Sequence, residues 1–261
     1  MPLFGEVFMI RIWTWVAVAF LAAASAHAQQ ASRLDEILKR GTLRVGMTGD
    51  YLPFTYLDKA TMKFRGFDVD MAEALGKALG VRVEYVPTVW PQLMKDFEAD
   101  SFDIAMGGIS ITLDRQFSTP IMREGKTPIA RCADKGKYEE IADIDKPGTR
   151  VIVNPGGTNE RFARANIKNA EIRIHSDNVT IFDEIAKGDA DLMITDASET
   201  QYQQKLHAGV LCAVHPEKPF DFAEKAYWLQ RDVALKAFVD QWLHISIQDG
   251  SYKKIYAAWF D

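Results

Sequence analysis

The chain has 261 residues, with 31 lysines and arginines, 36 aspartates and glutamates, and a formal net charge of −5. This acidic balance and the lack of a basic cluster argue against nucleic acid or anionic membrane as partners. The five histidines are scattered and no CxxC or HExxH motif occurs, so a metal ion is not expected. Roughly 230 residues follow the leader described next, enough for one large domain or two lobes.

The first 28 residues have the pattern of a cleaved signal peptide. Arg11 supplies a basic region, residues 13–24 are apolar, and Ala26-His27-Ala28 is a small-x-small cleavage site, so cleavage is expected after Ala28. The apolar run is too short for a transmembrane helix and no second one follows. Either Met1 or Met9 can be the initiator, and the expected product is a periplasmic protein without membrane insertion.

Cys132 and Cys212 are the two cysteines of the chain. In an oxidising compartment an even number of cysteines favours a disulfide. The alternative is two separate buried thiols. Export makes the disulfide the expected state.

Strands and helices alternate after the leader. The first helix is expected to begin with a capping box at Ser32-Arg-Leu-Asp35 and to end at Gly41. Asp68 is the expected N-cap of the next helix, and Pro91 is expected in the first turn of the third helix. The order β-α-β-α-β predicts a parallel wound sheet. The expected elements are helix 33–40, strand 42–47, helix 66–79, strand 81–86, helix 90–98 and strand 103–106.

A polar, extended stretch at 123–131 then predicts a crossover to a second lobe, where the pattern restarts. Residues 217–229 run back, and two helices, 233–247 and 252–259, end the chain. The expected fold is α/β, a two-lobed clamshell with a ligand cleft and two crossover segments. Lobe 1 is expected to comprise 29–126 and 221–261, and lobe 2 residues 127–220. The expected elements of lobe 2 are strand 149–153, helix 160–166, strand 171–175, helix 178–187, strand 192–195 and helix 197–205.

The stretch 191–199 combines a short buried strand with the start of a helix. Asp196 and Glu199 therefore fall at the carboxyl end of a strand and in the first turn of the next helix, where open α/β sheets bind ligands. One interpretation is a capping box, in which both side chains satisfy backbone N–H groups. In the other, both carboxylates face the cleft and Glu199 handles a proton.

Two other positions near strand ends carry open alternatives. Tyr51 and Phe54 lie in the loop after the first strand, where they line a pocket for a flat ligand unless Phe54 simply fills the core. Arg115 follows the third strand, where its guanidinium either binds a carboxylate or is a surface charge.

The Gly-rich loop 154–159 can bind an anion through its backbone N–H groups, or be a tight turn with Thr158 as N-cap. It matches no nucleotide-binding motif. Lys126 lies in the crossover, facing either the cleft or solvent.

Several of these motifs resemble those of the periplasmic polar-amino-acid-binding proteins of ABC importers, over the whole mature chain. The resemblance implies a type II periplasmic-binding-protein fold. It also implies that Arg115 and the Gly-Thr start of a helix bind an α-carboxylate and that Asp196 binds the α-amino group. The matching stretches are Gly66-Phe-Asp-Val-Asp-Met-Ala72, Asp103 to Gly108, Thr112-x-x-Arg115, Gly156-Gly157-Thr158, Asp196 and Gly250 to Trp259.

Four stretches resemble a narrower group, the exported cyclohexadienyl dehydratases. The resemblance implies conversion of prephenate to phenylpyruvate, and of arogenate to phenylalanine, with loss of water and CO2 and without a cofactor. The runner-up is a non-catalytic binding protein with an ABC permease as partner. The four stretches are 124–129, 153–166, 195–199 and 212–227.

The resemblance also implies roles for individual residues. Glu199 would protonate the departing hydroxyl, which requires a pKa above the ~4.3 of free Glu, raised by burial or by Asp196. Lys126 would steady negative charge on the substrate. Asp196 suits the ammonium of arogenate but has no positive partner on prephenate, so the preferred substrate stays open. The expected catalytic residues are Glu199, Lys126 and Asn154, and the expected binding residues are Arg115, Gly156, Gly157, Thr158, Asp196, Trp90, Phe54, Tyr51, Thr112 and Ser110.

Overall fold

The computed structural model describes residues 32–261. The expected signal peptide, its cleavage site and both candidate initiators lie outside the described residues. Within residues 32–261, no helix is both long and apolar enough to cross a bilayer.

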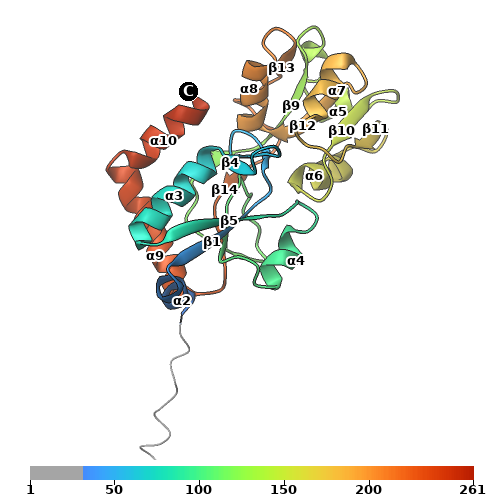
Figure 1. Cartoon of the computed structure of the whole chain (residues 1–261). Helices are drawn as coiled ribbons and strands as arrows, with labels where there is room; N and C mark the ends of the chain where they lie inside the picture. The colour runs from blue at the N-terminus through green and yellow to red at the C-terminus, as the bar shows by residue number, and fades with distance from the viewer. Residues whose placement is uncertain (1–31) are drawn as a thin grey trace, which may run out of the picture. The chain divides into compact units, whose positions relative to one another are not determined.

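The first of two five-stranded sheets is built mainly from the N-terminal part of the chain (Figure 1). Its strands are β1 (Thr42–Met47), β5 (Arg82–Pro87), β6 (Ile104–Ala105), β7 (Gln116–Phe117) and β15 (Trp228–Leu229), in the order β5-β1-β6-β15-β7. The three strands expected from the sequence, β1, β5 and β6, pair in parallel, whereas β15 runs antiparallel to both neighbours. Strand β1 is buried along almost its whole length, as is typical of a parallel strand covered on both faces.

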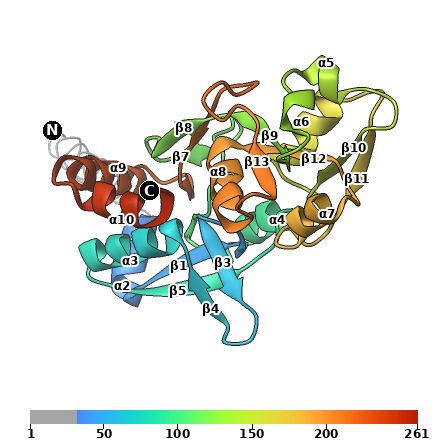
Figure 2. The same ribbon diagram turned by 90° about the horizontal axis from the view of Figure 1, so that it is seen from above.

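Helices α2 (Arg33–Arg40), α3 (Phe67–Leu79), α4 (Leu93–Glu98), α9 (Val233–Gln248) and α10 (Ser251–Phe260) accompany this sheet. The predicted capping box of Ser32 and Asp35 is formed, and Gly41 ends α2 in the left-handed conformation. Figure 2 shows α3, α9 and α10 grouped beside β1 and β5. They bury an apolar core around Phe67, Leu75 and Trp242. Full burial of one such side chain contributes about 1.5–3 kcal/mol.

The second sheet repeats the pattern. Its strands are β9 (Lys126–Arg131), β10 (Arg150–Val153), β11 (Glu171–Ile174), β12 (Leu192–Asp196) and β13 (Leu211–Ala213), in the order β11-β10-β12-β9-β13. Strands β10, β11 and β12 are parallel, and β9 is antiparallel to β12 and β13. The accompanying helices are α5 (Ile141–Ile144), α6 (Thr158–Asn166), α7 (Ile181–Lys187) and α8 (Ala197–Leu206), with a short 3-10 turn, η1 (Lys135–Lys137).

Two short antiparallel strands, β8 (Met122–Glu124) and β14 (Ala223–Lys225), lie where the chain passes from one sheet to the other and back. Glu124 pairs with Ala223, and Met122 pairs with Lys225. The two crossovers expected from the sequence are therefore hydrogen-bonded to each other. The lobe boundaries predicted from the sequence stay a prediction.

The structure joins Cys132 and Cys212 in a disulfide, as expected. Cys132 directly follows β9, and Cys212 lies in β13, which pairs with β9. The bond therefore fastens the end of an inner strand to the edge of the second sheet.

Three expectations about the elements are wrong. Asp68 does not cap α3, whose N-cap is Gly66; its buried carboxylate accepts a hydrogen bond from the Gly108 N–H at 2.7 Å. The crossover 123–131 is not polar throughout, because five of the six residues of β9 are buried. Helix α4 begins at Leu93, after Pro91. The strand β13 and the hairpin strands β2 (Asp50–Tyr51), β3 (Thr55–Asp58) and β4 (Lys63–Arg65) were not expected at all.

Candidate active site

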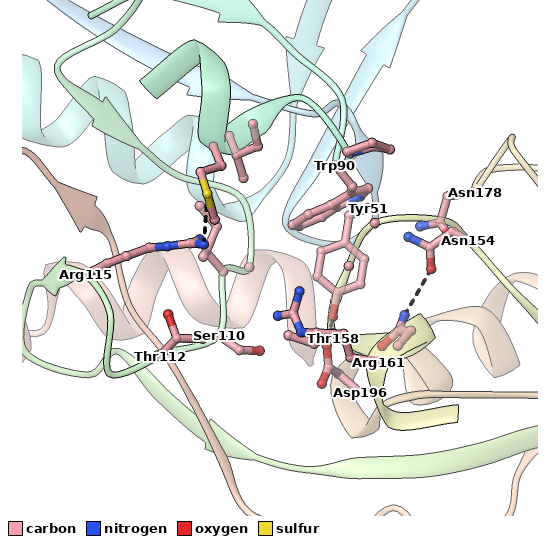
Figure 3. A pocket seen from close by; sticks show the side chains of 18 of the residues that line it. Tyr51, Trp90, Ser110, Thr112, Arg115, Asn154, Thr158, Arg161, Asn178 and Asp196 are labelled. Carbon is pink, nitrogen blue, oxygen red and sulfur yellow. Dashed lines mark hydrogen bonds between the residues drawn. The ribbon is translucent and has the colours of Figure 1, made fainter. Parts of the chain in front are cut away.

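A cavity of about 230 Å³ lies where the loops of the two sheets meet (Figure 3). The first sheet contributes the loop after β1, the start of α4 and the loop after β6. The second contributes the loop between β10 and α6, Asn178 and the end of β12. The sequence-predicted residues that line the cavity are Tyr51, Trp90, Ser110, Thr112, Arg115, Asn154, Gly156, Gly157, Thr158 and Asp196.

This gathering follows from the topology. Asp196 is the last residue of β12, and Asn154 directly follows β10, its parallel neighbour. The carboxyl ends of parallel strands share one edge of a sheet, which is the edge where open α/β sheets bind ligands.

Phe54 does not line the cavity, contrary to expectation. Its side chain is fully buried in the core beside α3 and stacks against Tyr51, with 5.1 Å between ring centroids. The Trp90 ring packs against Tyr51 in a T-shaped arrangement, with 5.8 Å between ring centroids. Phe54 therefore supports the Tyr51 ring, and Tyr51 and Trp90 form the aromatic wall.

Asp196 lies beside this wall and is a buried carboxylate with three hydrogen-bond donors. Its Oδ1 accepts a hydrogen bond from Lys126 Nζ at 2.7 Å, and its Oδ2 accepts from Lys225 Nζ at 2.6 Å. The Tyr51 hydroxyl, which points toward Asp196 in Figure 3, also donates to Oδ2. Burial opposes ionisation, but the two ammonium groups outweigh it and hold the pKa of Asp196 well below its usual range. Asp196 is thus an anion at all physiological pH values.

The expected capping box of Asp196 and Glu199 is not formed. Asp196 is the N-cap of α8 by position, but its side chain makes no capping hydrogen bond. Both of its oxygens are directed to the lysines and to Tyr51 instead, because buried charges require charged partners. The structure therefore excludes the capping interpretation. The expectation that both carboxylates face the cleft holds for Asp196, which lines the cavity, but is wrong for Glu199, which does not.

Glu199 is buried in the first turn of α8, with 1 % of its surface exposed. One carboxyl oxygen accepts a hydrogen bond from Thr195 Oγ1 at 2.5 Å. Burial raises the pKa of Glu199 to about 8; the Thr195 hydrogen bond opposes this shift and the charge of Asp196 adds to it. At neutral pH the side chain is therefore mostly protonated, as a general acid must be.

Lys126 connects Asp196 to α6. Its ammonium donates to Thr158 Oγ1 at 2.9 Å and to Asn159 Oδ1, as well as to Asp196. Burial lowers its pKa, and Asp196 opposes that shift. Asn159 in turn donates to Thr195 Oγ1 at 2.9 Å, so a continuous chain of hydrogen bonds joins Lys126 to Glu199.

Neither Lys126 nor Glu199 is itself in the cavity wall. Lys126 contacts three lining residues directly, namely Thr158, Asn159 and Asp196. Glu199 contacts Thr195, which accepts a hydrogen bond from the lining residue Asn159. Asn154, the third expected catalytic residue, lines the cavity and accepts from Asn159 at 3.3 Å. The expected catalytic residues thus share one network at one end of the cavity.

The Gly-rich loop differs in two ways from the expectation. Helix α6 has Gly157, not Thr158, as its N-cap, and the Thr158 hydroxyl accepts a hydrogen bond from Lys126. The N–H of Gly156 donates to Glu160 Oε2 at 2.7 Å and is not free for an anion. A side chain at Gly156 would also come within 2.8 Å of Pro91 from the opposite wall. The loop therefore needs glycine for close packing as well as for its backbone conformation.

Arg115 lies in the wall with its guanidinium stacked over Trp228, 4.3 Å from the ring centroid. Its Nε is 3.3 Å from Asp114 Oδ2, and a terminal nitrogen contacts Met94 Sδ at 3.8 Å. Stacking fixes the plane of the guanidinium, which reduces the entropy lost when a carboxylate binds.

The residues that were not expected from the sequence include Arg161, Asn178 and Asn159 in the wall and Lys225 and Glu124 behind it. Those named, except Asn178, lie inside the stretches that carry the narrower resemblance, but nothing in their spacing indicated a role. Within the described part of the chain, Arg115, Lys95 and Arg161 are the cationic lining residues, and Asp196, the one anionic residue in the wall, is paired with two lysines. The cavity therefore suits an anion. Among residues 32–261 no group of three or more His, Cys, Asp or Glu side chains is placed to hold a metal ion.

Residues 43–261 match the model of the bacterial extracellular solute-binding proteins, family 3. The chain belongs to this family. One relative is the cyclohexadienyl dehydratase of Pseudomonas aeruginosa, 55 % identical over 248 residues, covering 94 % of this chain and 91 % of the relative. Another is the L-cystine-binding protein TcyJ of Escherichia coli, 28 % identical over 69 % of both chains. The relatives of this chain thus include both an enzyme and binding proteins.

Two ancestral proteins are among the similar solved structures. AncCDT-1 is an ancestral amino-acid-binding protein described as a precursor of cyclohexadienyl dehydratase. It is 37 % identical, covers 88 % of this chain and 100 % of its own, and superposes with a TM-score of 0.80. A single-residue variant of the ancestral cyclohexadienyl dehydratase AncCDT-3 is 50 % identical, covers 90 % and 98 %, and has a TM-score of 0.55. The fold is therefore the two-lobed α/β fold expected from the sequence.

Proposed function

We propose that this protein is a periplasmic cyclohexadienyl dehydratase that converts prephenate to phenylpyruvate, with arogenate as the related amino substrate. The observation that carries the proposal is Glu199, a buried carboxyl group with a pKa of about 8 beside a cationic cavity. A protein that only binds amino acids has no use for such an acid. The 55 % identical Pseudomonas aeruginosa dehydratase supports the same conclusion. Export through the expected signal peptide, with cleavage after Ala28, is part of the proposal.

The reaction needs one proton and no external electrons. Glu199 gives its proton to the ring hydroxyl, whose carbon–oxygen bond breaks to release water. The ring carboxylate leaves as CO2, and the electron pair of its carbon–carbon bond completes the aromatic ring. Glu199 then regains a proton from solvent. The balance is prephenate dianion plus one proton to phenylpyruvate anion, CO2 and water.

The cavity offers a place for each part of this substrate. Arg115 would hold the side-chain carboxylate through its fixed guanidinium fork. Tyr51 and Trp90 would face the ring, whose hydroxyl must point toward Asn159, from which hydrogen bonds through Thr195 lead to Glu199. Lys126, with Asn154 nearby, would steady the negative charge of the substrate at that end.

Turnover of prephenate by the purified mature protein at neutral pH tests the proposal. Phenylpyruvate is followed by its absorbance in alkali, against the spontaneous rate without protein. We expect formation proportional to protein concentration. The second candidate is a non-catalytic amino-acid-binding protein that works with an ABC permease, as the similarity to TcyJ would favour. It predicts thermal stabilisation by an amino acid and no turnover, and that result would overturn the dehydratase.

Replacing Arg115 by leucine is expected to lower kcat/KM for prephenate by roughly tenfold to a hundredfold, because a charge-assisted pair is worth about 1.5–3 kcal/mol. The loss should appear mainly in KM. Arg115→Lys is the matched variant: it keeps the charge but loses the fork and the stacking on Trp228. Steady-state kinetics on all three proteins checks this, and an unchanged KM in Arg115→Leu would exclude Arg115 from carboxylate binding.

A further inference from the structure

The proposed reaction makes no use of Lys225, which is one of the most buried side chains of the protein, with 1 % of its surface exposed. It lies at the end of β14, in the returning crossover. Its ammonium is 2.6 Å from Asp196 Oδ2, 3.1 Å from Ser110 Oγ and 3.4 Å from the Tyr51 hydroxyl. A buried lysine is costly to keep charged, so its contacts require an explanation.

Lys225 and Lys126 together take up both oxygens of Asp196. Lys126 approaches Oδ1 and Lys225 approaches Oδ2, where the Tyr51 hydroxyl also donates. Asp196 is the one anionic residue in the cavity wall among the described residues. An α-ammonium group entering the cavity would therefore be the third cation around one carboxylate, in a buried site where like charges repel strongly.

Glu124 is the other carboxylate near Lys225, and it does not restore an ammonium site. Its Oε1 is 3.5 Å from Lys225 Nζ, and its Oε2 accepts from the Ser198 N–H at 3.0 Å. Glu124 does not line the cavity. It therefore partly neutralises the charge of Lys225 but cannot contact a bound ligand.

Prephenate and arogenate differ at one place, where prephenate has a keto oxygen and arogenate an ammonium group. A keto oxygen needs no anionic partner and can accept a hydrogen bond, whereas an ammonium needs the acceptor that the lysines occupy. The same argument applies to free L-amino acids.

We propose that Lys225 is a specificity-determining residue: by occupying Asp196 Oδ2, it weakens the binding of α-ammonium ligands relative to that of the α-keto diacid. The inference deepens the proposed function and rests on it for the identity of the two substrates. Lys225 acts through Asp196 and is a positioning residue, not a catalytic one.

The test is the ratio of kcat/KM for prephenate to kcat/KM for arogenate in the wild-type protein and in Lys225→Met. Methionine keeps much of the length of lysine without the charge. We expect the ratio to fall by roughly tenfold or more, the effect of one charge-assisted contact. A purely structural lysine would lower both values together and leave the ratio unchanged, which would overturn the inference.

Two further variants guard against misfolding. Lys225→Arg keeps a cation and is expected to retain a ratio closer to wild type than Lys225→Met does. In Lys225→Met, the buried Glu124 carboxylate has lost its lysine partner. The double variant Glu124→Gln/Lys225→Met removes that unpaired charge, and its ratio of kcat/KM values should fall as it does in Lys225→Met. If either Met-containing variant that melts cooperatively keeps the wild-type ratio, the inference is wrong.

A second readout separates this inference from the proposed function. Thermal shift measures binding of L-phenylalanine and of phenylpyruvate without any turnover. Lys225→Met should gain affinity for L-phenylalanine relative to phenylpyruvate by a similar factor. If neither substrate is turned over but this selectivity shifts, the dehydratase proposal fails and the role of Lys225 stands. If turnover occurs and the selectivity does not shift, the dehydratase proposal stands and the role of Lys225 is wrong.

Discussion

Glu199→Gln is expected to lower kcat for prephenate by about 10²–10⁴-fold, the usual contribution of a positioned general acid. Glutamine has nearly the size of the protonated acid and can still accept from Thr195 Oγ1. It cannot release a proton to the ring hydroxyl. Since the Glu199 side chain is already mostly neutral at pH 7, the substitution changes the charge of the site little, and KM should change by less than roughly threefold.

Glu139→Gln is the matched control, because Glu139 is exposed on the surface of the protein. It should retain the wild-type kcat. Near-wild-type turnover by a folded Glu199→Gln protein would remove Glu199 from the mechanism. A large rise in KM with little loss in kcat would instead mean that Glu199 binds substrate rather than protonating it.

Lys126→Met is expected to lower both activity and stability. The substitution removes one of the two cations that hold Asp196 and leaves Thr158 and Asn159 without their shared donor. Breaking a buried ion pair costs about 3–5 kcal/mol of unfolding free energy, and the low end applies here because Lys225 still pairs with Asp196. Loss of a buried charge beside the substrate should lower kcat/KM by roughly 10²–10³-fold.

Urea unfolding and steady-state kinetics measure these two effects separately. Lys187→Met is the control, since its lysine is exposed and pairs with Glu184 at 3.4 Å on the surface of α7. A Lys126→Met protein with wild-type kcat/KM would show that the hydrogen-bond chain from Lys126 to Glu199 has no part in the reaction.

The wound order of the strands could be predicted from the sequence because the signals were local. The bounds of α2 and β1 could be predicted to the residue from the Ser32 cap, the Gly41 stop and the apolar run of β1. The parallel order then brings Asn154 and Asp196 to one edge. The antiparallel strands β7, β13 and β15 are only two or three residues long, too short for any periodicity to show.

The site was less predictable where contacts come from distant parts of the chain. Lys225 is separated from Asp196 by 29 residues and from Tyr51 by 174, so no spacing rule could link them. Phe54 follows Tyr51 closely in the chain and has a similar aromatic ring, yet only the fold decides which of them reaches the cavity. The capping interpretation of Asp196 failed for the same reason, because two distant lysines compete for its oxygens.

The most direct test of a protonated Glu199 is the dependence of kcat/KM for prephenate on pH. Burial raises the pKa of Glu199 to about 8, so the acid is present below that pH and lost above it. kcat/KM should be level near pH 7 and fall about tenfold per pH unit well above pH 8, since this parameter reports the free enzyme. Glu199→Gln should lack that fall. Values that stay constant or rise up to about pH 9.5 in the wild-type protein would contradict the assignment of Glu199 as the proton donor.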